Sequence, residues 1–273
     1  MDRRSYLKTS AGAIGGLSLA GCLDTLTGGA TDDTESVTIG SDIPYRPFEY
    51  RENDGTLVGF DVEIAEAVFG DELGMEVEFQ ETSFDGIIQS LKNGNFDVIM
   101  SAMTINEERA EEVDFSDPYF TAYQTVVVLE DSDVDELEDL RGETVAVQKG
   151  TTGQGAAEQL QEDFDGELTV DSYDQITGAF DALQNNQAIA VINDNTVNAE
   201  YVNETDNVRF LEGDGEAAED GENAPPYLTL TVEEYGIAFR QDDDDFREDV
   251  NGALAAIKED GTYDEIYGEY FEG

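Results

Sequence analysis

The sequence contains no histidine and a single cysteine, Cys22, and these two shortages remove most of the common catalytic centres. Without histidine there can be no Ser-His-Asp or Cys-His triad and no histidine-based metal site, and one cysteine cannot form a thiolate zinc site. A lone cysteine cannot form an intramolecular disulfide either. An enzyme built on this chain would depend on carboxylate or lysine chemistry.

Positive charge is also scarce in the sequence. Only 13 lysine and arginine residues stand against 65 aspartate and glutamate residues, which gives a formal net charge of −52. This excludes a nucleic-acid partner, because binding a polyanion requires clustered cationic side chains. The acids are spread through segments with regular hydrophobic periodicity, so we expect a folded chain rather than an acidic disordered one. Such a surface is suited to molar salt, where the Debye length falls to about 3 Å, and it predicts a protein of an extreme halophile.

The N-terminus carries a mildly apolar run at 9–20 that is too short to cross the ~30 Å hydrocarbon core of a membrane. Arg3 and Arg4 before it resemble a twin-arginine export signal, and LAGC at 19–22 resembles a lipobox, in which the cysteine is lipidated and becomes the mature N-terminus. Residues 1–22 are therefore predicted to be an export signal and 23–36 a flexible tether. Together they predict a cell-surface lipoprotein on the outer face of the cytoplasmic membrane, anchored through lipid on Cys22.

From residue 37 onward, short apolar runs alternate with segments of helical period, which is the pattern of an α/β protein with largely parallel sheets. Strands are expected at 37–40, 75–79, 96–100, 124–129, 143–148, 188–192 and 235–240. Helices with apolar stripes are expected at 60–68, 84–91, 173–183 and 246–257. The acidic stretch 131–135 lacks the glycine and glutamate of an EF-hand loop, and we expect no metal and no cofactor.

Two expected helix starts directly follow expected strands. Thr104 and Glu107 have the spacing of a capping box and predict a helix that begins at Thr104. Arg109 follows one turn later, where its guanidinium can contact a carboxylate at two points. GTTG at 150–153 opens the second helix. Helix starts favour anions, and open α/β sheets bind ligands at the carboxyl ends of their strands, so both starts are candidate carboxylate seats.

Three motifs resemble those of one known family. They are GFDVEIA at 59–65, FDGIIxxLxxGxxDVIxSxxTxxxxR at 84–109, and GTYDEIYGEYF at 261–271, in which Tyr270 stands where tryptophan is common. Together they are similar to the family 3 solute-binding proteins, the polar amino-acid receptors of ABC importers. The resemblance covers nearly the whole mature chain. It implies a monomeric receptor that delivers a free amino acid to an ABC permease and its ATPase.

The resemblance also implies a two-lobed, periplasmic-binding-protein-like fold of type II. Lobe 1 would comprise 37–122 and 233–273, and lobe 2 would comprise 123–232. Two crossover segments near 121–125 and 232–236 would join the lobes and act as the hinge about which they close on ligand in the cleft.

Ten residues match ligand-binding positions of the family. Arg109 and Thr104 would bind the α-carboxylate, and the Ser101–Ala102 region would help. From the other lobe, the segment Thr151–Thr152 would supply a further carboxylate contact through Thr152. Asp194 would bind the α-ammonium group.

The remaining three matches concern the ligand's side chain. The aromatic rings of Tyr45 and Phe84 would sandwich it, and Asp42 would meet a polar or cationic end group. This combination suits arginine, lysine, ornithine, histidine or glutamine. Gln148 and Lys149 are not diagnostic, and Lys149 close to the cleft would favour an acidic or neutral ligand, so the identity of the amino acid stays open.

Two other functions remain open at this point. Some dehydratases of prephenate-like substrates share the two-lobed scaffold, although the zwitterion clamp at Asp194 argues against a dicarboxylate substrate. A ligand-sensing module for a signalling partner is the second alternative.

Overall fold

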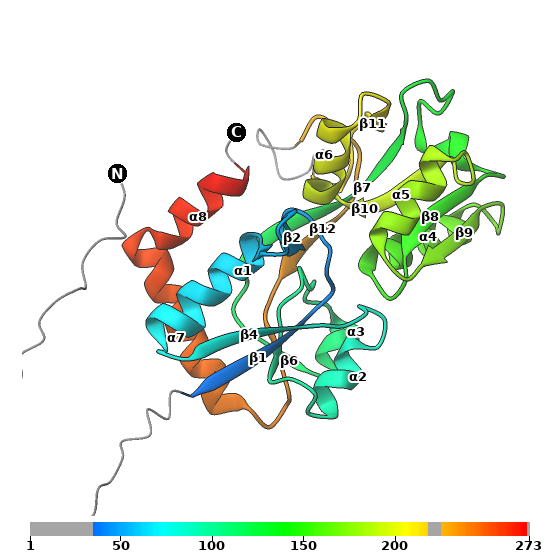
Figure 1. The fold of residues 1–273 in the computed structure, drawn as a ribbon. Helices are drawn as coiled ribbons and strands as arrows, with labels where there is room; N and C mark the ends of the chain where they lie inside the picture. The colour runs from blue at the N-terminus through cyan, green and yellow to red at the C-terminus, as the bar shows by residue number, and fades with distance from the viewer. Residues whose placement is uncertain (1–34, 218–224, 272–273) are drawn as a thin grey trace, which may run out of the picture. The chain divides into compact units, whose positions relative to one another are not determined.

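The structure, a computed structural model, describes residues 35–217 and 225–271, which form two large β-sheets and a two-stranded one, with helices around them (Figure 1). The predicted export signal, the arginine pair and Cys22 lie outside the described residues, as does most of the predicted tether.

The first sheet has five strands in the order β4-β1-β5-β13-β6. Their bounds are Glu76–Glu81 for β4, Ser36–Ser41 for β1, Val98–Ile99 for β5, Ala238–Phe239 for β13 and Asp114–Phe115 for β6. β1 runs parallel to β4 and β5, whereas β13 runs antiparallel to β5 and β6. In the sequence, β1 is followed by a small antiparallel hairpin of β2, Tyr50–Arg51, and β3, Leu57–Val58.

The second sheet has six strands. Its main path is β11-β7-β10-β8-β9, and β12 also pairs with β7. The bounds are Val208–Phe210 for β11, Phe120–Leu129 for β7, Ala190–Asp194 for β10, Thr144–Gln148 for β8, Thr169–Tyr173 for β9 and Thr229–Tyr235 for β12. Only the pairs β8-β9 and β8-β10 are parallel. The prediction of largely parallel sheets was wrong, because apolar runs identify strands without showing which way the chain returns.

Strands β7 and β12 lie side by side and link the two sheets along the chain (Figure 1). They pair antiparallel from Thr125 and Thr229 at one end to Phe120 and Tyr235 at the other. β12 was not predicted. Its sequence, TLTVEEY, carries two adjacent acids where a buried strand is expected to be apolar.

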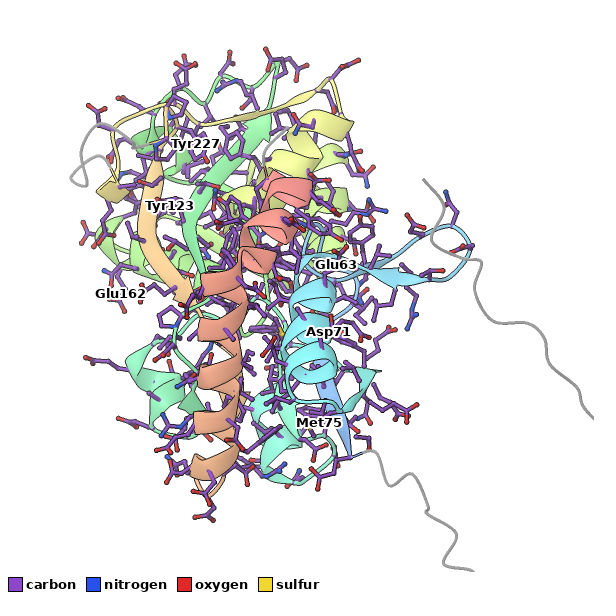
Figure 2. All side chains as sticks on the ribbon, turned by 90° about the vertical axis from the view of Figure 1, so that its left-hand side faces the viewer. Glu63, Asp71, Met75, Tyr123, Glu162 and Tyr227 are labelled. Carbon is purple, nitrogen blue, oxygen red and sulfur yellow. The ribbon has the colours of Figure 1, made fainter. Side chains whose placement is uncertain are left out.

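Helices α1, Phe60–Ala65, and α7, Asp244–Asp260, belong to the first sheet's part of the chain; α1 continues as a π-helical segment, η1, Glu66–Glu72. α7 packs against η1 and continues into α8, Thr262–Phe271. Figure 2 shows these helices side by side, with Glu63 and Asp71 labelled on the α1–η1 stretch. The predicted apolar stripes face inward, since Phe60, Ile64 and Val68 are fully buried.

Gly59 permits the start of α1. Its φ is +137°, and a Cβ there would lie 2.1 Å from the Phe48 carbonyl oxygen, so any other residue would be both strained and blocked. At the far end of the chain, the ring of Phe271 lies 5.1 Å from that of Phe60 and 4.9 Å from that of Phe120. This aromatic cluster packs α8 against the start of β7.

The second sheet is accompanied by η2, Leu137–Leu140, and by the helices α4, Thr152–Asp163, α5, Ile176–Gln184, and α6, Asn195–Glu204. Two short helices, α2, Ile87–Lys92, and α3, Glu107–Ala110, lie in the segment of the long family motif. The helix expected from Tyr173 starts only at Ile176, because Tyr173 is the last residue of β9 and pairs with Gln148.

The expected helix start at Thr104 was also wrong. α3 begins at Glu107, and the side chain of Asn106 caps it by accepting the Arg109 N–H at 2.9 Å. Thr104 instead forms an isolated bridge with Tyr235 and turns its hydroxyl toward a carboxylate. A helix of four residues supplies little dipole, so we assign no anion seat to it. The second start is confirmed, since Thr151 caps α4 by accepting the Gln154 N–H at 3.2 Å.

Candidate functional site

A small cavity lies at the carboxyl ends of four strands, β1, β5, β8 and β10. Its volume is about 10 Å³, which is the space of about one water molecule. All ten residues that the sequence analysis assigned to the ligand line this cavity, and Gln148 joins them: Asp42, Tyr45, Phe84, Ser101, Ala102, Thr104, Arg109, Gln148, Thr151, Thr152 and Asp194. The fold therefore gathers around one point residues that are far apart in the sequence.

Among the described residues, Arg109 is the only cationic one that lines the cavity. Its side chain is buried, and its Nη1 donates to the Thr104 carbonyl at 2.8 Å while Nη2 donates to the Gly150 carbonyl at 3.2 Å. The guanidinium carbon lies 5.2 Å from the centre of the Phe84 ring. Burial lowers the pKa of Arg109 from its usual value. Within 35–217 and 225–271 it has no ion pair, although the charges of Glu233 and Asp194 act on it, so its guanidinium is available to an anionic group of a ligand.

The hydroxyls of Thr104 and Thr152 meet at a carboxylate that the sequence analysis missed. Thr104 Oγ1 donates to Glu233 Oε2 at 2.6 Å and Thr152 Oγ1 donates to the same oxygen at 2.8 Å. Glu233 lies on β12 and is 7% exposed. The one available signal was the period of two along 229–235, where alternate residues share a strand face.

Asp194 ends β10 and is buried. The Tyr45 hydroxyl and the side-chain amide of Gln124 both donate to its carboxylate. Burial, and after it the charge of Glu233, raises the pKa of Asp194 to about 7. A cationic partner at this carboxylate would reverse that shift, because an adjacent positive charge favours the ionised form.

Asp42 and Gln148 lie together on the cavity wall. The Gln148 side-chain amide donates to Asp42 Oδ2, and burial raises the pKa of Asp42 to about 6. Lys149 does not line the cavity. Its ammonium group pairs instead with the carboxylate of Asp85 at 2.7 Å, and both side chains are about half exposed. The ammonium group of Lys149 is therefore engaged by Asp85, and Lys149 is not among the residues that line the cavity with Asp42.

Ser101 and Ala102 line the cavity with their polar donors directed elsewhere. The Ser101 hydroxyl donates to Glu49 Oε1 at 2.7 Å, and the Ala102 N–H donates to Asp61 Oδ2 at 2.8 Å. Asp61 also accepts from the Tyr119 hydroxyl at 2.9 Å.

Glu49 and Asp61 form a fully buried acidic pair behind this wall. Burial raises the pKa of Asp61 to about 7 and that of Glu49 well above its usual range, and the charge of Asp61 adds to the shift at Glu49. The charged form of Glu49 is therefore disfavoured both by burial and by the charge of Asp61. Neither residue was predicted from the sequence, although Asp61 is part of the motif GFDVEIA.

The family model of bacterial extracellular solute-binding proteins, family 3, matches residues 37–273. The chain belongs to this family. The family 3 protein is similar to the arginine-binding extracellular protein ArtP of Bacillus subtilis, with 31% identity over 94% of this chain and 97% of that protein. A solved structure of an ancestral arginine-binding protein bound to arginine is 37% identical, has a TM-score of 0.76, and covers 86% of this chain and 98% of its own. The predicted family and two-lobed α/β fold are thus confirmed.

A third similar protein touches on the dehydratase alternative. It is an ancestral amino acid-binding protein, AncCDT-1, described as a precursor of cyclohexadienyl dehydratase. It is 35% identical, with a TM-score of 0.74, and covers 86% of this chain and 95% of its own. The three similar proteins named above are thus binding proteins, and one of them is a precursor of an enzyme.

Two further features concern the described part of the chain alone. No helix there has both the length and the apolar character needed to span a membrane. No group of three or more carboxylate, cysteine or histidine side chains there is arranged to hold a metal ion.

Proposed function

We propose that this family 3 solute-binding protein captures a free basic amino acid outside the cell and delivers it to an ABC permease and its ATPase. The observation that carries the proposal is the distribution of charge around the cavity. Arg109 presents a buried guanidinium that forms no ion pair within the described part of the chain, and the carboxyl groups of Asp42 and Asp194 line the same cavity. That set complements a zwitterion with a second positive charge.

The groups of the ligand are assigned to opposite walls in this proposal. Arg109, Thr104 and the Thr151–Thr152 segment bind the α-carboxylate. Ser101 and Ala102 form the wall beside it, and Asp194 binds the α-ammonium group.

The side chain of the ligand is assigned to the remaining walls. It lies between the rings of Tyr45 and Phe84, and its cationic end reaches Asp42, whose neighbour Gln148 is a hydrogen-bonding partner for the same group. Similarity to an arginine-binding protein supports a basic ligand.

Binding requires the cleft to open, because a cavity of about 10 Å³ cannot admit an amino acid. We propose that lobe 1, 37–122 with 233–273, and lobe 2, 123–232, rotate about the paired strands β7 and β12 near 121–125 and 232–236. Closed contacts such as the one from Arg109 Nη2 to the Gly150 carbonyl would break on opening. Ligand stabilises the closed form by touching both lobes.

The site of action proposed is the outer face of the cytoplasmic membrane. The arginine pair and the lipobox at Cys22 support twin-arginine export and a lipid anchor. The net charge of −52 supports an extreme halophile as the source. The receptor is proposed to act as a monomer, as the family resemblance implies.

A melting-temperature screen of the mature chain in about 3 M KCl tests the function. Because ligand binds the folded state alone, arginine, lysine or ornithine at a thousandfold excess over Kd should raise the melting temperature by about 8 °C or more. Glutamate and aspartate should give no shift. Conversion of prephenate to product, without a shift by any amino acid, would replace the receptor with the dehydratase.

Affinity for the basic amino acid should fall as the pH is lowered from 8 to 6. Asp194 and Asp42 have pKa values of about 7 and about 6 without ligand. The ligand's cationic groups lower both values, so binding is fully favoured above pH 8 and must release protons below it. We expect about a tenfold loss of affinity at pH 6. Titration calorimetry in two buffers of different ionisation enthalpy should detect proton release at pH 6 and little at pH 8; equal affinity at both would contradict the assignment.

A further inference from the structure

Glu233 is a buried carboxylate at the cleft that the proposed function does not use. It lies on β12 with its side chain turned inward, whereas its neighbours Val232 and Glu234 are exposed. β12 is one of the two strands that link the sheets. Glu233 is therefore placed where it can act on both the ligand and the hinge.

Glu233 accepts hydrogen bonds from the same threonine hydroxyls that are proposed to bind the α-carboxylate of the ligand. One oxygen, Oε2, accepts from Thr104 Oγ1 at 2.6 Å, from Thr152 Oγ1 at 2.8 Å and from Gln124 Nε2 at 3.3 Å. The other, Oε1, accepts from Thr231 Oγ1 at 2.9 Å. Thr104 lies in the loop after β5 of the first sheet, and Thr152 is the first residue of α4, which follows β8 of the second sheet. They are also two of the groups proposed to hold the α-carboxylate of the ligand.

The α-carboxylate of a ligand cannot bind to Thr104 and Thr152 while Glu233 keeps its hydrogen bonds to them. Each threonine hydroxyl has one proton to donate, so the pair cannot donate to Glu233 and to an amino-acid carboxylate at once. Two carboxylates at one seat also repel each other. Glu233 lines a neighbouring groove of about 600 Å³ together with Arg109 and Thr231, and this space lets its side chain turn away when an amino acid arrives.

A basic amine without a carboxylate meets no such conflict. Glu233 can keep the hydroxyls of Thr104 and Thr152, and its charge stays close enough to Arg109 to favour the protonated guanidinium. Asp194 and Asp42 can still bind the two cationic ends of the amine.

We propose that Glu233 is a specificity-determining residue that competes with the carboxylate of the ligand, so that the cleft accepts basic amines lacking a carboxylate as a second class of ligand. The inference rests on the proposed function, because it takes Arg109, Thr104 and Thr152 as the carboxylate seat.

The test compares arginine with agmatine, the amine that differs from it by loss of the carboxylate, by titration calorimetry in about 2 M KCl. The wild-type protein should bind both. In Glu233→Gln, arginine should bind more tightly and agmatine more weakly, so that the ratio of their Kd values shifts by about tenfold or more toward arginine. Glu234→Gln is the matched control, since it removes the same charge from the exposed face of the same strand, and its ratio should equal that of the wild type.

Three outcomes overturn the inference. Affinities that fall in parallel for both ligands in Glu233→Gln would show a purely structural role, and unchanged affinities for both ligands would show none. Wild-type protein that binds arginine but not agmatine would remove the second ligand class. If the wild-type protein binds no amino acid at all, the proposed function itself fails. Should Glu233→Gln not fold, Glu233→Ser also removes the carboxylate and should shift the ratio in the same direction.

Discussion

Arg109→Ala is expected to weaken the binding of a basic amino acid by about a hundredfold or more, which corresponds to about 3 kcal/mol. The side chain is buried, and the two hydrogen bonds of its guanidinium go to the carbonyls of Thr104 and Gly150 rather than to a carboxylate. Removing it leaves the α-carboxylate of the ligand buried beside Thr104 without a counter-charge. Titration calorimetry at fixed salt measures the change.

Two further variants separate the role of this charge from other effects. Arg109→Lys keeps the charge but loses the planar fork, and should retain part of the affinity. Arg51→Ala removes an arginine that hydrogen-bonds the Gly55 carbonyl on an exposed hairpin and should bind as the wild type does. Near wild-type affinity in Arg109→Ala would refute the carboxylate assignment.

Removal of salt is expected to unfold the mature chain completely at neutral pH. With 65 acidic against 13 basic side chains, mutual repulsion acts over a Debye length of about 30 Å at 0.01 M salt and only about 3 Å at 1 M. The acids project from the exterior, as Figure 2 illustrates with Asp71 and Glu162. Because the chain has no tryptophan, far-ultraviolet circular dichroism is the suitable probe, and it should show a cooperative loss of structure as KCl is diluted.

The salt effect is attributable to screening if two conditions hold. Sucrose at matched osmolality should not replace KCl, since it is uncharged. A variant with Gln or Asn at the exposed α4 acids Glu158, Glu162 and Asp163 should unfold at a lower KCl concentration than the wild type. A chain that remains folded in 0.01 M KCl would refute the halophilic interpretation.

The long motif at 84–109 shows why the sequence was informative about the site. It spans the loop before α2, the strand β5 and the residues that follow, and every residue assigned from it lies at the cavity. Spacing along a continuous segment is a local property, so it can be compared directly with a family. The prediction of a helix that begins at Thr104 was wrong because it depended on a distant contact. The Thr104 hydroxyl donates to Glu233, which is 129 residues away in the sequence.

The acidic residues show the limit of sequence reasoning most clearly. By residue type alone, Glu49, Asp61 and Glu233 do not differ from the many exposed acids of this chain. Only packing assigns them different chemistry, because burial raises the pKa values of Glu49 and Asp61, and hydrogen bonds from Thr104 and Thr152 give Glu233 its position.

The sequence by itself determined the absence of histidine and thiolate chemistry, the dependence on salt that we expect, the α/β class and the family. These follow from composition, periodicity and local spacing, which need no knowledge of distant contacts. The tertiary structure alone decided the directions of the strands, the pairing of β7 with β12 and the meeting of Glu233 with two threonine hydroxyls at the cleft. Those features depend on which segments of the chain come together, and a period of two along β12 says nothing about the partner that its inward face will meet.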